Sequence, residues 1–275
     1  MKSTIYWIIS DRFAYLILLS ALSLYSVFLV GCGKTELTSK WRSIDISIDG
    51  DDADWQNRKT YIEKARVAIG LFNDDKFLYL NLTPWNNGIQ IQMMNMGFTV
   101  WFDPKGDRNN MCGIRFPTGT TGQFVPVSDR GNRDDIIKRI ETFAESQKEL
   151  EIIVSSEDEH IKMSLNDAIR LGIEVKVGNS NGKLFYELKV PLSRDELHPY
   201  TVGADTTGII SIGFETPGLD LRTMERMRKE NSIPRPGGSG DMSPRDVGPL
   251  PGGIGGLPEH LELWATVKLA QGPGV

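Results

Sequence analysis

The chain has 275 residues, with 31 Lys and Arg against 36 Asp and Glu, so its formal net charge is -5. This mild acidity argues against a nucleic-acid-binding protein, which needs a basic surface to contact phosphates. Hydrophobic residues make up 40% of the chain and charged residues 24%, which is typical of a globular protein and not of a disordered one. Two cysteines and three histidines exclude a disulfide scaffold and disfavour a zinc site.

The N-terminal segment has the composition of a targeting sequence. Two basic residues flank its polar start, and residues 13–30 are then apolar or small without a charge. Such a run is either the apolar part of a signal peptide or a membrane-spanning helix. The sequence Leu29-Val30-Gly31-Cys32 then follows the order aliphatic, aliphatic, small, cysteine. It resembles the lipobox of bacterial lipoproteins, which implies a signal peptide over residues 1–31, cleavage before Cys32, and a lipid on the Cys32 thiol.

A lipid anchor on Cys32 predicts a protein of the cell envelope, anchored to the membrane and facing the periplasm or the exterior. Two or three acyl chains anchor strongly, because each buried methylene contributes about 0.8 kcal/mol. Gly33 stands where lipoproteins of the inner membrane usually have aspartate, so the resemblance favours the outer membrane of a Gram-negative cell. The alternative is an uncleaved anchor, which also leaves the folded part outside the cytoplasm. With Cys32 acylated, we expect Cys112 to be a buried, unpaired small residue.

Apolar and polar residues alternate over many short segments of the chain, the pattern of half-buried β-strands. Residues 32–43 read as a polar tether, and turn signals such as residues 73–76 separate the later strands. The segments predicted to be strands are residues 44–48, 64–71, 77–82, 89–93, 98–102, 184–190, 208–214 and 261–269. They predict an all-β fold, an antiparallel β-sandwich over residues 44–270.

Two regions depart from the strand pattern. Residues 133–147 have apolar side chains at helical spacing and predict an amphipathic helix, and residues 165–171 predict a second, short one. We expect these one or two helices to form an insertion over residues 133–171 that closes an open end of the sandwich; a partner-binding role is the alternative. Residues 234–258 are dense in Gly and Pro and predict a second insertion, a long loop that is either padding or a ligand lid.

Several segments resemble, in their order, family 9 carbohydrate-binding modules, which belong to the wider DOMON-like group of β-sandwiches. The segments that carry this resemblance are residues 47–55, with an apolar-Asp-Gly opening before Trp55, and residues 64–80, 98–103 and 185–192. The resemblance implies a DOMON-like sandwich of the jelly-roll type with a non-catalytic, sugar-binding role. Members of the family hold a sugar between two tryptophans. Residues 92–97, where one of these would stand, contain neither Trp nor an acidic residue.

Exposed aromatic rings are the candidate ligand-binding groups, because the C–H faces of a sugar stack on them. Trp85, Asn86 and Asn87 lie in a predicted loop near the position of the family's sugar site. The alternation of its strand turns Trp101 away from the core, and Trp264 is placed in the same way. We expect Trp85, Asn86, Asn87 and Trp101 to form the ligand platform. The alternative for Trp101 and Trp264 is that the inserted helix covers them.

We expect no cofactor and no enzymatic activity. The sequence has no phosphate-binding Gly-rich loop, no metal-ligand helix motif and no nucleophile motif. The acidic turns of residues 49–54 and 103–109 either hold a calcium ion or are ordinary turns. The sequence therefore predicts a lipid-anchored envelope protein with a carbohydrate-binding domain, whose partners are the membrane and a glycan. The alternatives are a structural or protein-interaction lipoprotein that binds another envelope protein, and a paired-acid hydrolase.

Acylation of Cys32 can be tested by substitution. Cys32→Ala removes the only thiol that the motif offers for acylation, so the variant is expected to keep its leader and to lose membrane attachment through lipid. Globomycin treatment is expected to shift the gel mobility of the wild type and to leave Cys32→Ala unchanged. Identical mobility of both proteins with and without globomycin contradicts the lipoprotein assignment.

Overall fold

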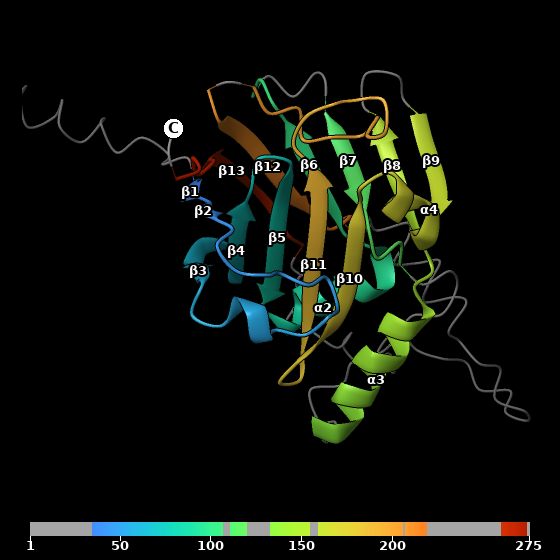
Figure 1. Cartoon of the computed structure of the whole chain (residues 1–275). Coiled ribbons are helices and arrows are strands. Elements are labelled where there is room, and N and C mark those ends of the chain that lie inside the picture. Colours follow the sequence, from blue (N-terminus) through green and yellow to red (C-terminus); the bar gives the residue numbers. More distant parts are fainter. Residues whose placement is uncertain are drawn as a thin grey trace, which may run out of the picture. The chain divides into compact units, whose positions relative to one another are not determined.

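The computed structural model describes residues 35–106, 111–119, 133–154, 159–205, 207–218 and 260–273. The chain divides into two units, residues 1–35 and residues 36–275, and the second unit holds nearly all of the described residues. Within it, two sheets lie face to face (Figure 1). The leader, Cys32 and the Gly/Pro-rich loop of residues 234–258 lie outside the described residues. In the described part of the chain, no helix is long and apolar enough to cross a membrane.

The larger sheet has seven strands, drawn from the whole length of the chain. In spatial order they are β1 (Thr35–Thr38), β13 (Glu262–Lys268), β12 (Ile209–Glu215), β6 (Thr99–Asp103), β7 (Cys112–Arg115), β8 (Glu149–Val154) and β9 (Glu159–Ser164). Each pair from β13 to β9 is antiparallel. This alternation of direction confirms the predicted antiparallel sheet.

The smaller sheet has six strands. In spatial order they are β10 (Glu174–Ser180), β11 (Lys183–Pro191), β5 (Phe77–Pro84), β4 (Val67–Asn73) and β2 (Lys40–Trp41), while β3 (Lys59–Ile62) also pairs with β4. The pairing of β2 with β4 is parallel and the others are antiparallel. Short 3-10 helices, η1 (Ala53–Trp55) and η2 (Glu63–Ala65), flank β3.

The core lies between the two sheets, where the inward faces of the strands meet. Leu78, Leu80 and Leu82 of β5 have no exposed surface, and the same holds for Val100 and Phe102 of β6. Both sets follow the period of two along their strands, because alternate side chains of a strand point to the same face. The all-β sandwich predicted from this alternation is confirmed.

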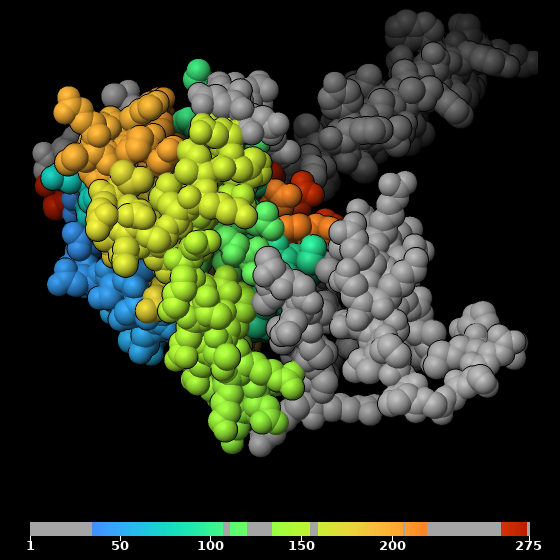
Figure 2. Space-filling view, turned by 90° about the vertical axis from the view of Figure 1, so that its right-hand side faces the viewer, coloured from blue at the N-terminus to red at the C-terminus, as the bar shows by residue number. Residues whose placement is uncertain are grey.

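The described residues include three α-helices, which pack against different parts of the sandwich. They are α2 (Asn87–Met96), α3 (Arg133–Ser146) and α4 (Leu165–Arg170). The two predicted helices correspond to α3 and α4, and Ile140 and Phe143 of α3 are buried in the main core. The rest of α3 projects away from the sheets (Figures 1 and 2). However, β8 and β9 lie between these helices and complete the larger sheet, so residues 133–171 are not simply an insertion.

The prediction of a strand over residues 89–93 was wrong, because these residues belong to α2. Isoleucine and glutamine alternate there, yet the glutamines are as buried as their apolar neighbours. The Gln90 side-chain oxygen accepts from the Leu184 backbone N–H at 2.8 Å, and that of Gln92 accepts from the Thr216 hydroxyl at 2.9 Å. Because these buried glutamines have hydrogen-bond partners, the alternation of apolar and polar residues here looks the same as in a strand whose polar residues face outward. The sequence pattern alone does not separate these two cases.

The start of the domain also differs from the prediction. β1 and β2 lie within residues 32–43, so the folded part begins before residue 44 and not after a polar tether. Residues 44–48 form no strand and belong to the covering loop, which we define as residues 42–58 between β2 and β3. Ile46 is nevertheless buried, since it packs against Phe72 and Tyr79 on the outer face of the smaller sheet.

A buried carboxylate fixes this covering loop. Glu187, on the outer face of β11, has no exposed surface. Its two carboxylate oxygens accept from the Trp55 indole N–H at 2.6 Å and the Gly50 backbone N–H at 2.7 Å. The Trp55 ring covers Gly70 so closely that a Cβ there would lie 2.6 Å from a ring carbon. Burial raises the pKa of Glu187 to about 7, although both hydrogen bonds favour the charged form.

Replacing the donor to Glu187 is expected to destabilise the fold. Trp55→Phe keeps an aromatic ring but removes the N–H, so a buried carboxylate oxygen loses its partner, at a cost of about 2–4 kcal/mol including the smaller ring. Trp101→Phe is the matched control, because its indole N–H also donates to a glutamate, Glu215 at 2.7 Å, but at an exposed position. That change is expected to cost less than about 1 kcal/mol. We call the two hydrogen bonds from Trp55 and Gly50 to Glu187 the Glu187 latch. Urea unfolding measures both variants, and equal losses of stability would contradict the role of this latch.

The raised pKa of Glu187 also predicts how stability depends on pH. Between the unfolded pKa of about 4.5 and the folded pKa of about 7, the folded protein binds a proton that the unfolded chain has released. The free energy of unfolding therefore falls as the pH rises through this window, by at most about 3 kcal/mol. In Glu187→Gln this contribution is absent, so the urea midpoint is expected to fall less between these limits. If the urea midpoints of wild type and variant change with pH in the same way, Glu187 is not the source of this pH dependence.

Candidate functional site

The outer face of the larger sheet carries a row in which tryptophan and glycine alternate. Trp264 of β13 pairs with Gly213 of β12, which in turn pairs with Trp101 of β6. Trp101 then pairs with Gly113 of β7. We call these four residues the aromatic row. It runs across the strands, so it joins side chains that are far apart along the chain.

The glycines let both indole rings cover the sheet. A Cβ on Gly213 would lie 2.7 Å from a ring carbon of Trp264, and a Cβ on Gly113 would lie 2.6 Å from a ring carbon of Trp101. Each ring therefore rests on the backbone of the next strand and turns its other face away from the sheet. Since neighbouring strands are about 4.8 Å apart, the two rings are separated by about 9.6 Å. Trp101 and Trp264 are both partly exposed.

Polar side chains line the aromatic row. The Trp101 indole N–H donates to the exposed Glu215 carboxylate at 2.7 Å, which fixes the rotation of the ring. Glu215 pairs with Glu262 of β13, so two carboxylates stand beside the tryptophans. A hollow of about 500 Å³ adjoins Trp264 and is lined also by Arg66, His260 and Glu262. Aromatic faces and carboxylates therefore meet on the outer face of the larger sheet, and the hollow beside Trp264 extends to η2, next to the smaller sheet.

The sequence left open that the inserted helix covers Trp101. Among the described residues, this helix does not lie on the face that carries Trp101. α3 packs against β10 and β11 of the smaller sheet. The expectation that Trp101 points away from the core is confirmed, since Val100 and Phe102 are buried on the other side of β6. Cys112 of β7 is unpaired in the described chain, partly buried and packed against the core.

Trp85 lies on the opposite side of the sandwich. It continues the outward-facing positions of β5 and is 56% exposed, next to Tyr61, which is 51% exposed. The two rings meet edge to face, with centroids 5.7 Å apart. The Lys183 ammonium lies 3.4 Å from the centroid of the Trp85 ring, and burial lowers the pKa of this lysine. One face of the Trp85 ring is therefore taken by a cation, which reduces its use as a sugar platform.

The predicted platform of four residues is thus divided between two faces. Asn86 is the N-cap of α2, and its side-chain oxygen accepts from the backbone N–H groups of Gly88 at 2.6 Å and Ile89 at 3.3 Å. Asn87 accepts from the Gln90 side chain at 3.2 Å. Both asparagines act at the start of this helix. Trp101 belongs to the aromatic row. The signal in the sequence for the second ring of this row was the strand alternation around Trp264, which turns it outward in the same way as Trp101.

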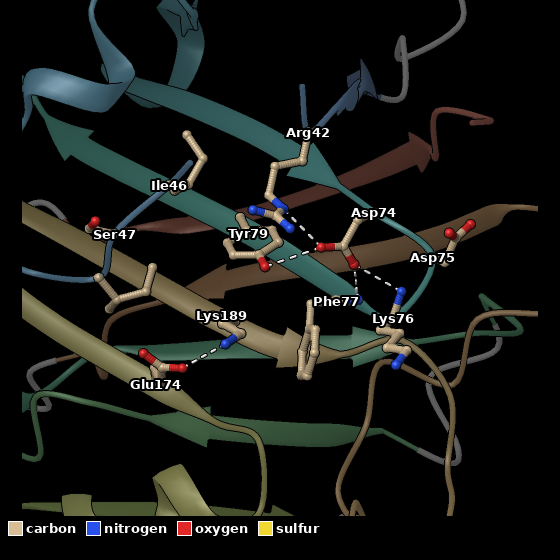
Figure 3. A pocket seen from close by; sticks show the side chains of 11 residues that line it. Arg42, Ile46, Ser47, Asp74, Asp75, Lys76, Phe77, Tyr79, Glu174 and Lys189 are labelled. Atoms are coloured by element: carbon tan, nitrogen blue, oxygen red, sulfur yellow. Dashed lines mark hydrogen bonds and ion pairs between the residues drawn. The ribbon is translucent and has the colours of Figure 1, made fainter. Parts of the chain in front are cut away.

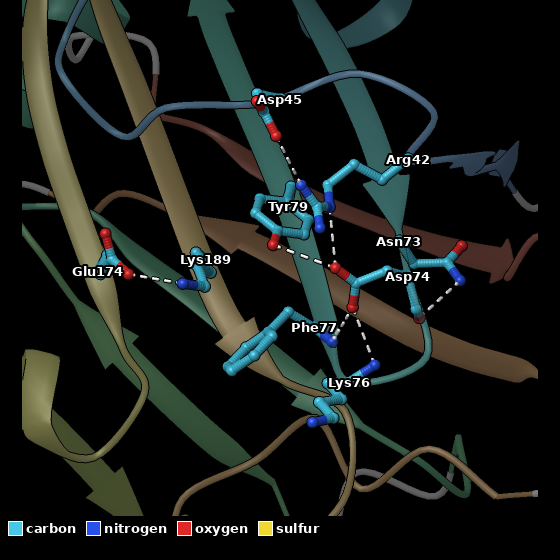
Figure 4. Close-up of polar contacts among 9 residues, drawn as sticks. All are labelled: Arg42, Asp45, Asn73, Asp74, Lys76, Phe77, Tyr79, Glu174 and Lys189. Atoms are coloured by element: carbon cyan, nitrogen blue, oxygen red, sulfur yellow. Dashed lines mark hydrogen bonds and ion pairs between the residues drawn. The ribbon is translucent and has the colours of Figure 1, made fainter.

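A charged pocket of about 690 Å³ lies on the outer face of the smaller sheet (Figure 3). Asp74, in the turn between β4 and β5, accepts from the Arg42 Nε at 2.8 Å and from the Tyr79 hydroxyl at 3.2 Å (Figure 4). Burial opposes ionisation of Asp74, but the N–H groups of Lys76 and Phe77 and the guanidinium outweigh it and lower the pKa. Burial and the Asp74 charge raise the pKa of Tyr79 to about 12, so its hydroxyl remains a donor.

The acidic turns act as turns in the described residues. Asp52 pairs with Lys59 and accepts from the Ser180 hydroxyl at 2.8 Å, and Asp54 accepts from the Ser47 backbone N–H at 2.9 Å. Asp103 accepts from two backbone N–H groups of the following turn. Among the residues that the structure describes, no group of three His, Cys, Asp or Glu side chains is placed to hold a metal ion. Part of the second turn, residues 107–109, lies outside them.

Comparison with known proteins gives no match to a family model and none to a curated protein. The chain is similar to two solved structures of a family 9 carbohydrate-binding module from Caldicellulosiruptor kristjanssonii, one with glucose and one with cellotriose. Each is 12% identical, with a TM-score of 0.33. The alignments cover 69% and 70% of this chain and 81% and 80% of the module. Because this TM-score is low, the assignment of a β-sandwich is based on the sheet topology of this chain and not on these two structures.

Proposed function

We propose that this chain is a lipid-anchored envelope protein whose sandwich binds carbohydrate without chemical turnover. The observation that supports this most is the aromatic row, in which two indole rings turn one face outward from the larger sheet. The apolar C–H face of a sugar ring stacks on such a surface. The carboxylates of Glu215 and Glu262 stand beside the rings as acceptors for hydroxyl groups. This is a binding surface with polar groups at its rim.

The separation of the rings bears on the size of the ligand. Trp101 and Trp264 are two strand spacings apart, about 9.6 Å, so a single sugar ring does not cover both. A ligand with several sugar units reaches both rings and extends toward the hollow beside Trp264. We therefore propose an oligosaccharide or polysaccharide as the ligand of this face.

The anchor is the second part of the proposal. The lipobox-like residues 29–32 and the apolar run before them support acylation of Cys32. A chain of this kind presents its folded domain in the cell envelope, facing the periplasm or the exterior, where glycans are abundant. Gly33 favours the outer membrane if the cell is Gram-negative. The membrane, through the lipid, and a glycan are then the two partners.

A protein-interaction lipoprotein is the second candidate. It is favoured by the exposed pair of Trp85 and Tyr61 on the other side of the sandwich. Aromatic residues of this kind are enriched in protein interfaces. In that case the Trp85 face, and not the aromatic row, holds the partner.

Substitution in the aromatic row separates the two candidates. The full chain is tested against a glycan array and by affinity electrophoresis in gels that contain the polysaccharides found. Trp101→Ala and Trp264→Ala each remove one stacking surface, so each is expected to weaken binding about tenfold or more.

Trp85→Ala is the matched control, because it removes an exposed tryptophan from the opposite face. It is expected to bind glycan like the wild type. Loss of binding in Trp85→Ala with retention in both row variants would refute the proposed platform. No glycan hit, together with an envelope protein whose binding depends on Trp85, would favour the second candidate.

A further inference from the structure

The charged pocket has no part in the proposed platform, since it lies on the other outer face of the sandwich. Its floor is formed by side chains of three adjacent strands: Glu174 of β10, Lys189 of β11 and Tyr79 of β5 stand opposite one another in register. Residues 46–48 of the covering loop form one wall (Figure 3). The Glu187 latch holds this same loop, so the pocket is shaped by a fixed segment.

The charges around the pocket balance. Three cations, Arg42, Lys76 and Lys189, face three anions, Asp74, Asp75 and Glu174. Two of these form close pairs, Arg42 with Asp74 at 2.8 Å and Lys189 with Glu174 at 2.6 Å. A pocket with equal numbers of both signs gives no net attraction to a charged ligand. It therefore suits a ligand that is neutral overall.

The Lys189–Glu174 pair keeps hydrogen-bonding capacity toward the pocket. Lys189 has three N–H donors and uses one on a single oxygen of Glu174, and no other hydrogen bond to Glu174 is found among the residues that the structure describes. The Arg42–Asp74 pair is more fully used. Asp74 already accepts from the Arg42 Nε, the Tyr79 hydroxyl and two backbone N–H groups that follow it, and a terminal nitrogen of Arg42 lies 3.5 Å from Asp45. The Lys189–Glu174 pair thus offers a cationic donor and an anionic acceptor side by side (Figure 4). These charge-assisted bonds are stronger than those between neutral groups.

A donor and an acceptor side by side match a pair of neighbouring hydroxyl groups. One hydroxyl donates to the Glu174 carboxylate while its neighbour accepts from the Lys189 ammonium, so both are satisfied at once. Ile48 adds apolar surface that suits the C–H groups of the same molecule, while the Phe77 ring holds the Lys189 ammonium, which lies 4.5 Å from the ring centroid. A volume of about 690 Å³ is within the usual range for small-ligand sites. We propose that this pocket binds a neutral polyhydroxy molecule the size of one or two sugar units, independently of the aromatic row.

The test uses the full chain in detergent, with the aromatic row removed by Trp101→Ala and Trp264→Ala together. Isothermal titration calorimetry with D-glucose, D-mannitol and maltose then reports on the pocket alone. At least one of these neutral probes is expected to bind. Lys189→Met in this background removes the ammonium and keeps the length of the side chain, so it is expected to weaken that binding about tenfold or more. Lys138→Met, an exposed lysine of α3, is the matched control and is expected to change nothing.

Glu174→Gln provides a second test that leaves the shape of the pocket intact and removes only the carboxylate. It is expected to weaken the same probe, and the urea midpoint checks that each variant is folded. Binding that survives both substitutions overturns the proposal, and so does the absence of any neutral probe. Inorganic phosphate that binds more tightly than every neutral probe would make the pocket an anion site. None of these outcomes affects the aromatic row, which is judged separately on its own variants with polysaccharide.

Discussion

The carboxylate of Glu187 is the group on which the shape of the smaller sheet's outer face depends. A carboxylate without exposed surface is costly, and in the described part of the chain two donors compensate it, the Trp55 indole and the Gly50 backbone N–H. Both donors belong to the covering loop, so the loop is held at the point where it satisfies the charge. The same contact places Trp55 over Gly70 and residues 46–48 beside the charged pocket. Burial of one acid thus determines the position of a segment with little regular structure.

The two outer faces of the sandwich are therefore chemically different. The smaller sheet is partly covered by its loop and keeps a charged pocket at the turn between β4 and β5. The larger sheet presents tryptophan rings that lie on the glycines of the neighbouring strands. Glycine at Gly113 and Gly213 is a packing requirement here, since a Cβ at either position would lift the ring above it. A domain of this kind has room for two separate ligand surfaces.

Strand periodicity was informative where one face of a segment is apolar and the other polar. It correctly indicated the buried faces of β5 and β6 and the outward direction of Trp101. It failed for α2, where Gln90 and Gln92 are buried with hydrogen-bond partners. It also failed for residues 44–48, whose alternation arises from a loop that packs Ile46 against the outside of a sheet. Alternation reports which side chains are buried, and several backbone conformations bury every second residue.

The sequence by itself determined the all-β class, the positions of α3 and α4 and the outward direction of single tryptophans, because these depend on periodicity over a few residues. Only the tertiary structure decided which of these tryptophans lie together. Strand register brings Trp264 beside Gly213 and Trp101, whereas Trp85 faces the other way from the second sheet. Register between distant strands depends on the packing of the whole core, and no local pattern contains it. The burial of Glu187 has the same origin, since the loop that covers it comes from 132 residues earlier in the chain.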